Sequence, residues 1–441
     1  MHSSGKAETM MSTDGLRRFV RSLAALDIAV PDAERVDQIR LLEELKSAAA
    51  AAQARVTTAF VASQEETQLE AGLSPSDVGK GIAAQVALAK RESPARGRRY
   101  IGWAGVLTGE LPGTFGRLQD GEITEWRASI VARETAWLSE IHRRAIDAEV
   151  AGDLEGWGDR RVEAEVKKRA YRLDPHGYLA RLAGAANDRT VTLRPAPDTM
   201  SYLTGYLPVA QGVAVLAALR RCADSVKSHG DDRSRGQIMA DTLVERVTGQ
   251  ATAEAVPVEV NLVMTDQSVF NIGSASDEPA HLDGYGPIPA ELARRLLLAA
   301  EASADAWVRR MFRSPETGEL ATMDSRRRLF GGSLRQLLVA RDQVCRTPWC
   351  DAPIRHADHV TAVAHGGETE SDNGQGLCEA CNYAKQAPGW RARQTRRRAG
   401  PVTETVTPTG HRYLSRAPEP PRGREQVRLD LYFAELIERS A

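Results

Sequence analysis

The chain has 441 residues, of which 42% are hydrophobic and 27% charged, and its formal net charge is −1. These values are typical of a globular protein with two to four domains, and the overall charge by itself does not indicate a nucleic-acid binder. No apolar run is long enough to cross a membrane, and the polar residues 1–15 contain no apolar signal core. We therefore expect a cytoplasmic protein with reduced cysteines and no membrane association.

The first part of the chain has the hydrophobic spacing of helices. Leu16, Phe19 and Leu23 recur at intervals of three and four residues, which places them on one helical face. Proline ends such a pattern, and Ser93-Pro94 is the clearest break. After a disordered start at residues 1–13, we predict helices at residues 14–69, 78–91, 124–150 and 160–172.

Strands are first predicted near residue 190. The segment Thr190–Leu193 alternates as a strand does, and Tyr202–Tyr206 is a suitable partner for it. A buried strand is predicted at Val256–Met264, with Val269–Ile272 pairing back to it. Further helices are predicted at residues 208–225, 236–247, 289–300, 333–341 and 429–437. The fold class is therefore predicted to be α+β, with a mainly helical N-terminal region that includes a small sheet.

Four of the five cysteines lie within one short segment, in two pairs: Cys345 with Cys350, and Cys378 with Cys381. Four thiolates can close a tetrahedral zinc site, and two cysteine pairs on separate turns are a common way to build one. The alternatives are a disulfide or buried free thiols. Because the pairs are clustered and no secretion signal is apparent, structural zinc is favoured.

Between the two pairs lie residues suited to phosphate chemistry. Asp358 and His359 are adjacent, so on a strand their side chains point to opposite faces. Carboxylate and amide oxygens, here from Asp358 and Asn382, are ligands for Mg²⁺ or Mn²⁺. A histidine near its ordinary pKa can accept a proton from water. The pattern thus predicts a divalent metal beside a general base.

The segment from Arg341 to Ala387 resembles the HNH endonuclease family, whose fold is two strands and a helix around one metal. The resemblance lies in the Asp-His pair, a His-Gly-Gly turn, an asparagine fourteen residues after His359, and LCEACN followed by Lys385. It implies that Asp358 and Asn382 hold the catalytic divalent metal, that His359 is the base and that Asn373 orients the base and its loop. It also assigns the four cysteines to structural zinc. Many members have histidine where this chain has Asn382, which leaves the preferred metal open.

The upstream sequence resembles a second family, the domain of unknown function that precedes HNH modules in actinobacterial 13E12-repeat proteins. The matching motifs span residues 40–310: GELPGTFGRLQDGEITEWRASIVARET, RAYRLDP, RGQIMADTL and GYGPIPAELARRL. This resemblance implies an architecture, not a mechanism. The predicted domains are a disordered segment at 1–13, a helix-rich domain at 14–310, a ββα-metal (HNH) module at 333–399, and a loose tail at 400–441.

Basic residues are concentrated around the cysteine segment. Residues 321–400 contain thirteen Arg or Lys and eight Asp or Glu, a local charge of +5 in a chain of net charge −1. Phosphate contacts supply most non-specific affinity for DNA. Six residues are therefore candidate DNA contacts, although a solvated surface would have the same composition: Lys385, Arg391, Arg393, Arg396, Arg397 and Arg398.

Three functions remain open from the sequence, of which the least favoured is a purely structural module behind an upstream protein-interaction domain. The first is a metal-dependent DNA endonuclease, in which water activated by His359 attacks a phosphodiester. The second is a zinc-stabilised DNA-binding protein without cleavage activity. His356 is a further candidate ligand, although the four cysteines already complete a zinc site. The sequence indicates DNA as the partner and does not identify a protein partner.

Overall fold

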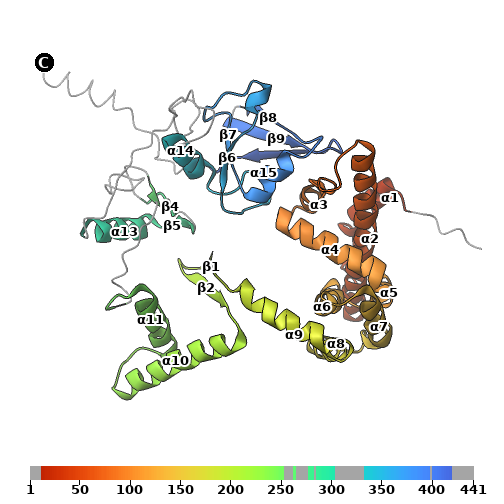
Figure 1. Cartoon of the computed structure of the whole chain (residues 1–441), viewed down its shortest axis with the longest axis horizontal. Coiled ribbons are helices and arrows are strands. Elements are labelled where there is room, and N and C mark those ends of the chain that lie inside the picture. Colours follow the sequence, from red (N-terminus) through yellow and green to blue (C-terminus); the bar gives the residue numbers. More distant parts are fainter. Residues whose placement is uncertain are drawn as a thin grey trace, which may run out of the picture. The chain divides into compact units, whose positions relative to one another are not determined.

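The computed structural model describes residues 11–252, 262–264, 277–282, 285–302, 332–397 and 400–419 (Figure 1). The chain forms two compact units, and each is described here by itself. The first unit comprises residues 1–59 and 103–175, and the second comprises residues 60–102 and 176–441. None of the helices in the described part of the chain has the length and apolar character needed to span a membrane. The α+β class with a mainly helical N-terminal region is confirmed.

The first unit is built from helices packed on a shared apolar core. Two of its helices, α2 (Asp32–Glu70) and α4 (Pro94–Glu110), extend into the second unit. The others are α1 (Thr13–Leu23), α5 (Pro112–Gln119), α6 (Glu125–Thr135), α7 (Glu140–Val150) and α8 (Asp159–Leu173). The largest fully buried side chains of this unit are Leu107, Leu111, Leu118, Ile123, Ile130, Ile146, Val131, Val150 and Leu154.

The predicted single helix at residues 124–150 is wrong, because two helices occupy this range. Ser139 caps the N-terminus of α7 by accepting a hydrogen bond from the backbone of His142. Arg143 donates to the carbonyl of Ala136, next to the end of α6. The apolar spacing continues through the break, which is why periodicity alone predicted one helix. Pro94 likewise begins α4, a helix that the sequence did not predict, since proline is tolerated in a first turn.

The upstream part of the second unit contains α3 (Ile82–Lys90), α9 (Pro175–Ala185) and a hairpin. The hairpin pairs β1 (Thr190–Pro195) with β2 (Ser201–Tyr206), as predicted. It is followed by α10 (Val209–Ser228) and α11 (Arg235–Thr248), which pack together; Ser234 and Gln237 form a capping box on α11. A small antiparallel sheet follows, with strands β3 (Leu262–Val263), β4 (Ala280–Leu282) and β5 (Gly286–Ile288). Helix α13 (Ala290–Ala302) comes after β5. The predicted strand at residues 269–272, and most of the one at 256–264, lie outside the described residues.

The last part of the second unit is termed the C-terminal module, residues 332–416 (blue-green and blue in Figure 1). Helix α14 (Gly332–Asp342) leads into a loop that holds Cys345 and Cys350. Strands β6 (His356–His359) and β7 (Gly374–Leu377) then pair antiparallel, with Asp358 opposite Gln375, and helix α15 (Glu379–Lys385) follows. Helix α14 contacts both strands, and α15 contacts β6. The module therefore contains the predicted two strands and helix.

The expectation of a loose segment from residue 400 is wrong for residues 400–416. Strands β8 (Arg391–Arg397), β9 (Gly400–Val406) and β10 (Arg412–Arg416) form an antiparallel sheet in this region. Prolines suggested a loose chain, but Pro401 lies near the start of β9 and Pro408 lies in the turn before β10. The rest of that tail, residues 420–441, lies outside the described residues, as do residues 1–10 of the predicted disordered start.

Candidate active site and metal centre

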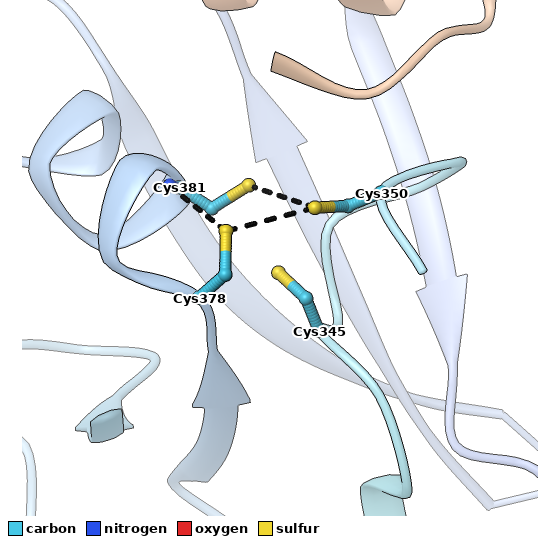
Figure 2. Close-up of side chains that lie close together, drawn as sticks. All are labelled: Cys345, Cys350, Cys378 and Cys381. Atoms are coloured by element: carbon cyan, nitrogen blue, oxygen red, sulfur yellow. Dashed lines mark hydrogen bonds between the residues drawn. The ribbon is translucent and has the colours of Figure 1, made fainter. Parts of the chain in front are cut away.

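The four clustered cysteines lie together in the C-terminal module. Their sulfur atoms all lie within 4.8 Å of one another, and all four residues are buried. Figure 2 shows the sulfurs pointing toward a common centre, with Cys350 3.6 Å from both Cys378 and Cys381. A disulfide has an S–S distance of about 2.05 Å, whereas a zinc tetrahedron with 2.3 Å bonds has sulfurs about 3.8 Å apart. All five cysteines are free, and the spacing of these four fits zinc.

Local backbone geometry sets this arrangement. The first pair lies in a tight loop, where the Cys345 N–H donates to Ala352 O and the Cys350 N–H donates to Thr347 O. Asp351, which follows the second cysteine, has a φ of 49°, a left-handed conformation that aspartate tolerates. The second pair spans the start of α15, where Cys378 is the N-cap and accepts from the Cys381 N–H at 3.4 Å. Two turns thus present two thiols each.

The electrostatics of the cluster favour a bound cation. Contact with the Cys345 thiol lowers the pKa of Cys378 far below its usual range and raises the pKa values of Cys350 and Cys381. The cause is that buried thiols so close together can stabilise one thiolate by hydrogen bonds, but cannot all ionise beside one another. A bound Zn²⁺ would remove this conflict, since its charge stabilises all four thiolates.

Asp358 and His359 lie at the end of β6 and have different environments. The Asp358 carboxylate is a quarter exposed, and its Oδ2 lies 2.5 Å from the Nζ of Lys385 on α15. The same ammonium also donates to the backbone carbonyl of His359. In the structure Lys385 contacts the predicted metal ligand, and its predicted contact with DNA phosphate stays a prediction. A cation therefore already lies at the carboxylate that would hold a divalent metal.

The His359 ring is buried and held in place. Its Nε2 lies 2.9 Å from the hydroxyl of Thr369, and its side chain and backbone together are only 8% exposed. Burial lowers the pKa of His359 below its ordinary value near 6.5, and the Lys385 ammonium also lowers it, while Asp358 acts in the opposite direction. The ring is therefore neutral at physiological pH, which is the form that can accept a proton.

Asn373 holds the loop between β6 and β7. Its Nδ2 donates to Thr361 O at 3.0 Å and to Glu368 O at 2.8 Å, and its Oδ1 accepts from the Thr361 N–H at 2.8 Å. Gly367 lies inside this loop, where a Cβ would be 1.9 Å from Thr361 O. Only glycine fits there. These contacts fix the loop that carries Thr369, and through it the ring of His359.

Asn382 lies on α15 and is buried, at 8% exposure. Its Oδ1 is buried without a hydrogen-bond partner among the described residues. A buried oxygen without a partner is costly and requires an explanation, and a cation is one. The neutral oxygen of Asn382 and the carboxylate of Asp358 are the hard donors that Mg²⁺ or Mn²⁺ accepts, so these residues fit the metal that the sequence predicts.

The family relationships follow from two sequence matches. A family model described as "Domain of unknown function (DUF222)" matches residues 39–342, more than half of the chain. The chain belongs to the DUF222 family. A second family model, HNH endonuclease, matches residues 343–387. No curated protein and no solved structure matches the chain significantly. The predicted order of a domain of unknown function followed by an HNH domain is confirmed, whereas the 13E12-repeat type stays a prediction.

The remaining predicted residues of this DUF222 protein have varied positions. Arg391 and Arg393 lie on β8 and are exposed, whereas Arg398 and the side chains of Arg396 and Arg397 lie outside the described residues. Among the described residues, the cluster that could hold a metal ion contains the four cysteines and not His356. The His356 ring lies instead 6.3 Å from the ring of Tyr383.

A buried ionic network was not predicted from the sequence. The side chain of Asp342, the last residue of α14, is fully buried and accepts hydrogen bonds from Arg341, Arg346 and the backbone of Gly376. Arg341 also donates to Ser371 O at 2.7 Å and to Gly374 O at 2.8 Å. The only sequence signal was an aspartate between two arginines, which resembles ordinary surface sequence. The network joins the HNH strands to the helix before them.

Proposed function

We propose that the protein is an endonuclease that hydrolyses DNA phosphodiester bonds with a divalent metal, Mg²⁺ or Mn²⁺. The observation that carries the proposal is the buried, neutral ring of His359, held by Thr369 beside the Asp358 carboxylate. A general base needs this combination of a lowered pKa and a fixed orientation. The match to the HNH endonuclease family supports the same reading.

Each residue then has a defined task. His359 accepts a proton from the water that attacks the phosphorus, and Asn373 keeps the loop around the ring in one conformation. Asp358 and the Asn382 oxygen, which has no hydrogen-bond partner in the described part of the chain, hold the divalent cation. When bound, that cation stabilises negative charge on the phosphate and on the leaving oxygen. The four cysteines hold Zn²⁺, which keeps α15 against the loop that precedes β6.

DNA contacts are proposed for the basic residues around this site. Lys385 and the arginines of the segment 391–398 are on the same module as His359, and local positive charge favours the phosphate backbone. In this proposal Lys385 exchanges its partner: it leaves the Asp358 carboxylate when the metal binds, and its ammonium then faces phosphate.

Plasmid cleavage tests the proposal directly. Purified full-length protein is incubated with supercoiled plasmid and Mg²⁺, Mn²⁺ or EDTA, beside a His359→Ala variant and a matched His365→Ala variant. His365 is an exposed histidine of the same module and serves as the control. We expect nicked or linear product with one of the two metals, none with EDTA, and loss only in His359→Ala. Equal cleavage by His359→Ala and the parent protein would refute the role of His359.

One observation favours a second candidate, a zinc-stabilised DNA-binding protein that does not cleave. The ammonium of Lys385 already neutralises Asp358 at 2.5 Å, and such a pair needs no metal. A folded, zinc-containing protein that binds DNA but leaves plasmid intact with every divalent metal would establish this alternative.

A further inference from the structure

The three-stranded sheet β8–β9–β10 has one face on which arginines gather. In its register, Arg393 pairs with Glu404, which in turn pairs with Leu414. Residues directly opposite each other in antiparallel strands have side chains on the same face. The face that contains Glu404 therefore also contains every second residue of both flanking strands, including four arginines that are all exposed: Arg391, Arg393, Arg412 and Arg416. We term these four residues the arginine face.

The charge of this face is not neutralised within the described sheet. Glu404 is the acidic residue among the four arginines, and it is shared: its Oε2 accepts from Arg393 and its Oε1 from Arg412. The side chains of Arg393 and Arg412 nevertheless remain 61% and 63% exposed. A guanidinium has five N–H donors, so each retains donors that point to solvent. Four arginines and one glutamate give a local charge of +3.

The opposite face and the edge strand β10 fix the sheet to the rest of the C-terminal module. Tyr413 lies edge-on against Trp349 of the cysteine loop, with ring centres 6.0 Å apart. The buried side chain of Arg346 donates to Ser415 O at 3.1 Å. A sheet anchored by such contacts presents its arginines in a constant position relative to the hairpin that carries His359.

We infer that the arginine face binds the phosphate backbone of duplex DNA and so positions the DNA for the site at His359. Along their strands, Arg391 and Arg393 are about 6.8 Å apart and Arg412 and Arg416 about 13.6 Å apart, and β8 and β10 are separated by about 9.6 Å, or two strand spacings. Duplex DNA carries one negative charge per about 1.7 Å of its axis, so several phosphates fall within this area. Guanidinium groups bind phosphate by paired hydrogen bonds, which suits exposed arginines better than a buried ion pair does.

The choice of DNA as ligand rests on the proposed function, but the surface is an independent observation. Arg412 and Arg416 lie outside both the HNH match and the basic run at 391–398, and the strand register alone places them beside Arg391 and Arg393. The inference therefore concerns how DNA is held and not how it is cut.

DNA binding by full-length His359→Ala protein tests the inference, because we expect this variant to cut DNA at least about 100-fold more slowly. Anisotropy of a labelled duplex of about 20 base pairs is measured over a range of salt concentrations. Each lost phosphate contact lowers the slope of log K against log salt by about 0.9. Adding Arg412→Gln and Arg416→Gln should therefore lower the slope by about 2 and weaken binding at least tenfold near 0.1 M salt.

A matched control separates this face from net charge. Arg335→Gln with Arg355→Gln removes the same charge from two exposed arginines on other elements of the module. We expect these changes to alter the slope much less than the loss of Arg412 and Arg416. An equal loss in both pairs, or no loss in either, would overturn the inference.

A second variant needs no loss of arginine. Leu414 lies opposite Glu404 and is 49% exposed, so a polar residue fits there. Leu414→Glu should weaken DNA binding, while Leu414→Gln should not, and equal binding by the two variants would count against the inference.

Failure of the endonuclease proposal gives a different result: a parent protein that binds DNA through the arginine face but does not cut it. Cleavage combined with an unchanged salt slope would instead refute the arginine face alone.

Discussion

Replacing Asp342 with asparagine tests the network that joins α14 to the strands. Each carboxylate oxygen of Asp342 accepts two hydrogen bonds: Oδ1 from Arg341 and Arg346, and Oδ2 from Arg341 and the Gly376 N–H. Asparagine has the same shape, but one oxygen becomes an NH₂ group. Whichever side it occupies, this group faces two N–H donors and can accept from neither. The negative charge that balances two buried guanidinium groups is lost at the same time.

The expected cost follows from these contacts. Breaking a buried ion pair by removing one partner costs about 3–5 kcal/mol, because the remaining charge stays buried. Asparagine keeps one acceptor oxygen, so we expect the lower end of this range, about 3 kcal/mol of local stability. Since about 1.4 kcal/mol corresponds to a factor of ten, the amides of β7 should exchange with solvent roughly 100-fold faster.

Hydrogen exchange with mass spectrometry on peptides of β6 and β7 measures this change locally, without requiring two-state unfolding of a chain with two units. Asp351→Asn is the matched control, because Asp351 is exposed in the same module and asparagine also tolerates its φ of 49°. We expect the control to exchange at the parental rate. Less than threefold acceleration in Asp342→Asn would show that the buried carboxylate contributes no more than a surface one.

Three further predictions concern the metals and the base. Cys378→Ser, or removal of zinc, should unfold the C-terminal module but leave the helices of the first unit folded, because a structural zinc site supplies on the order of 10 kcal/mol of folding free energy. Zinc content and circular dichroism measure this change. A variant that stays folded and zinc-loaded would disprove the cysteine site. His359→Ala should retain zinc and DNA binding, while the rate of plasmid nicking falls by about 100-fold or more, the usual effect of losing a general base. Nicking at the parental rate would exclude His359 as the general base. Lys385→Met should free the Asp358 carboxylate and so tighten Mn²⁺ binding, which a calorimetric or spin-resonance titration measures. An unchanged affinity for Mn²⁺ would show that the Lys385 ammonium does not compete with the metal.

The cysteine cluster of the candidate site was more predictable than the structure around it, because its sequence signal lies in short local motifs. The cysteine pairs are local motifs, so their spacing alone predicted a cluster that the structure brings within 4.8 Å. The resemblance likewise assigned an orienting role to Asn373, whose hydrogen bonds reach residues five and twelve positions away. By contrast, the contact of Lys385 with Asp358 joins residues 27 apart, on a helix and a strand. No local pattern specifies such a contact.

The errors in secondary structure have a similar origin. The break between α6 and α7 depends on the Ser139 cap and on Arg143, which is a small signal within a continuous apolar pattern. Strands β9 and β10 have few large apolar residues: β9 consists mainly of valine and threonine around Glu404, and β10 begins and ends with exposed arginines. Their stability comes from pairing and from contacts such as that of Tyr413 with Trp349, which becomes visible only in three dimensions.

The position of Asp342 has a consequence for how an HNH domain can be transferred between proteins. The two family matches meet between residues 342 and 343, so sequence comparison assigns this aspartate to the upstream domain. Its carboxylate nevertheless binds the strand that follows Asn373, and Leu338 of the same helix is fully buried. A recombination event at the family junction would separate Asp342 from Arg346 and Gly376. An HNH segment transplanted between proteins should therefore include α14, from Gly332 onward, to remain a folded unit in its new chain.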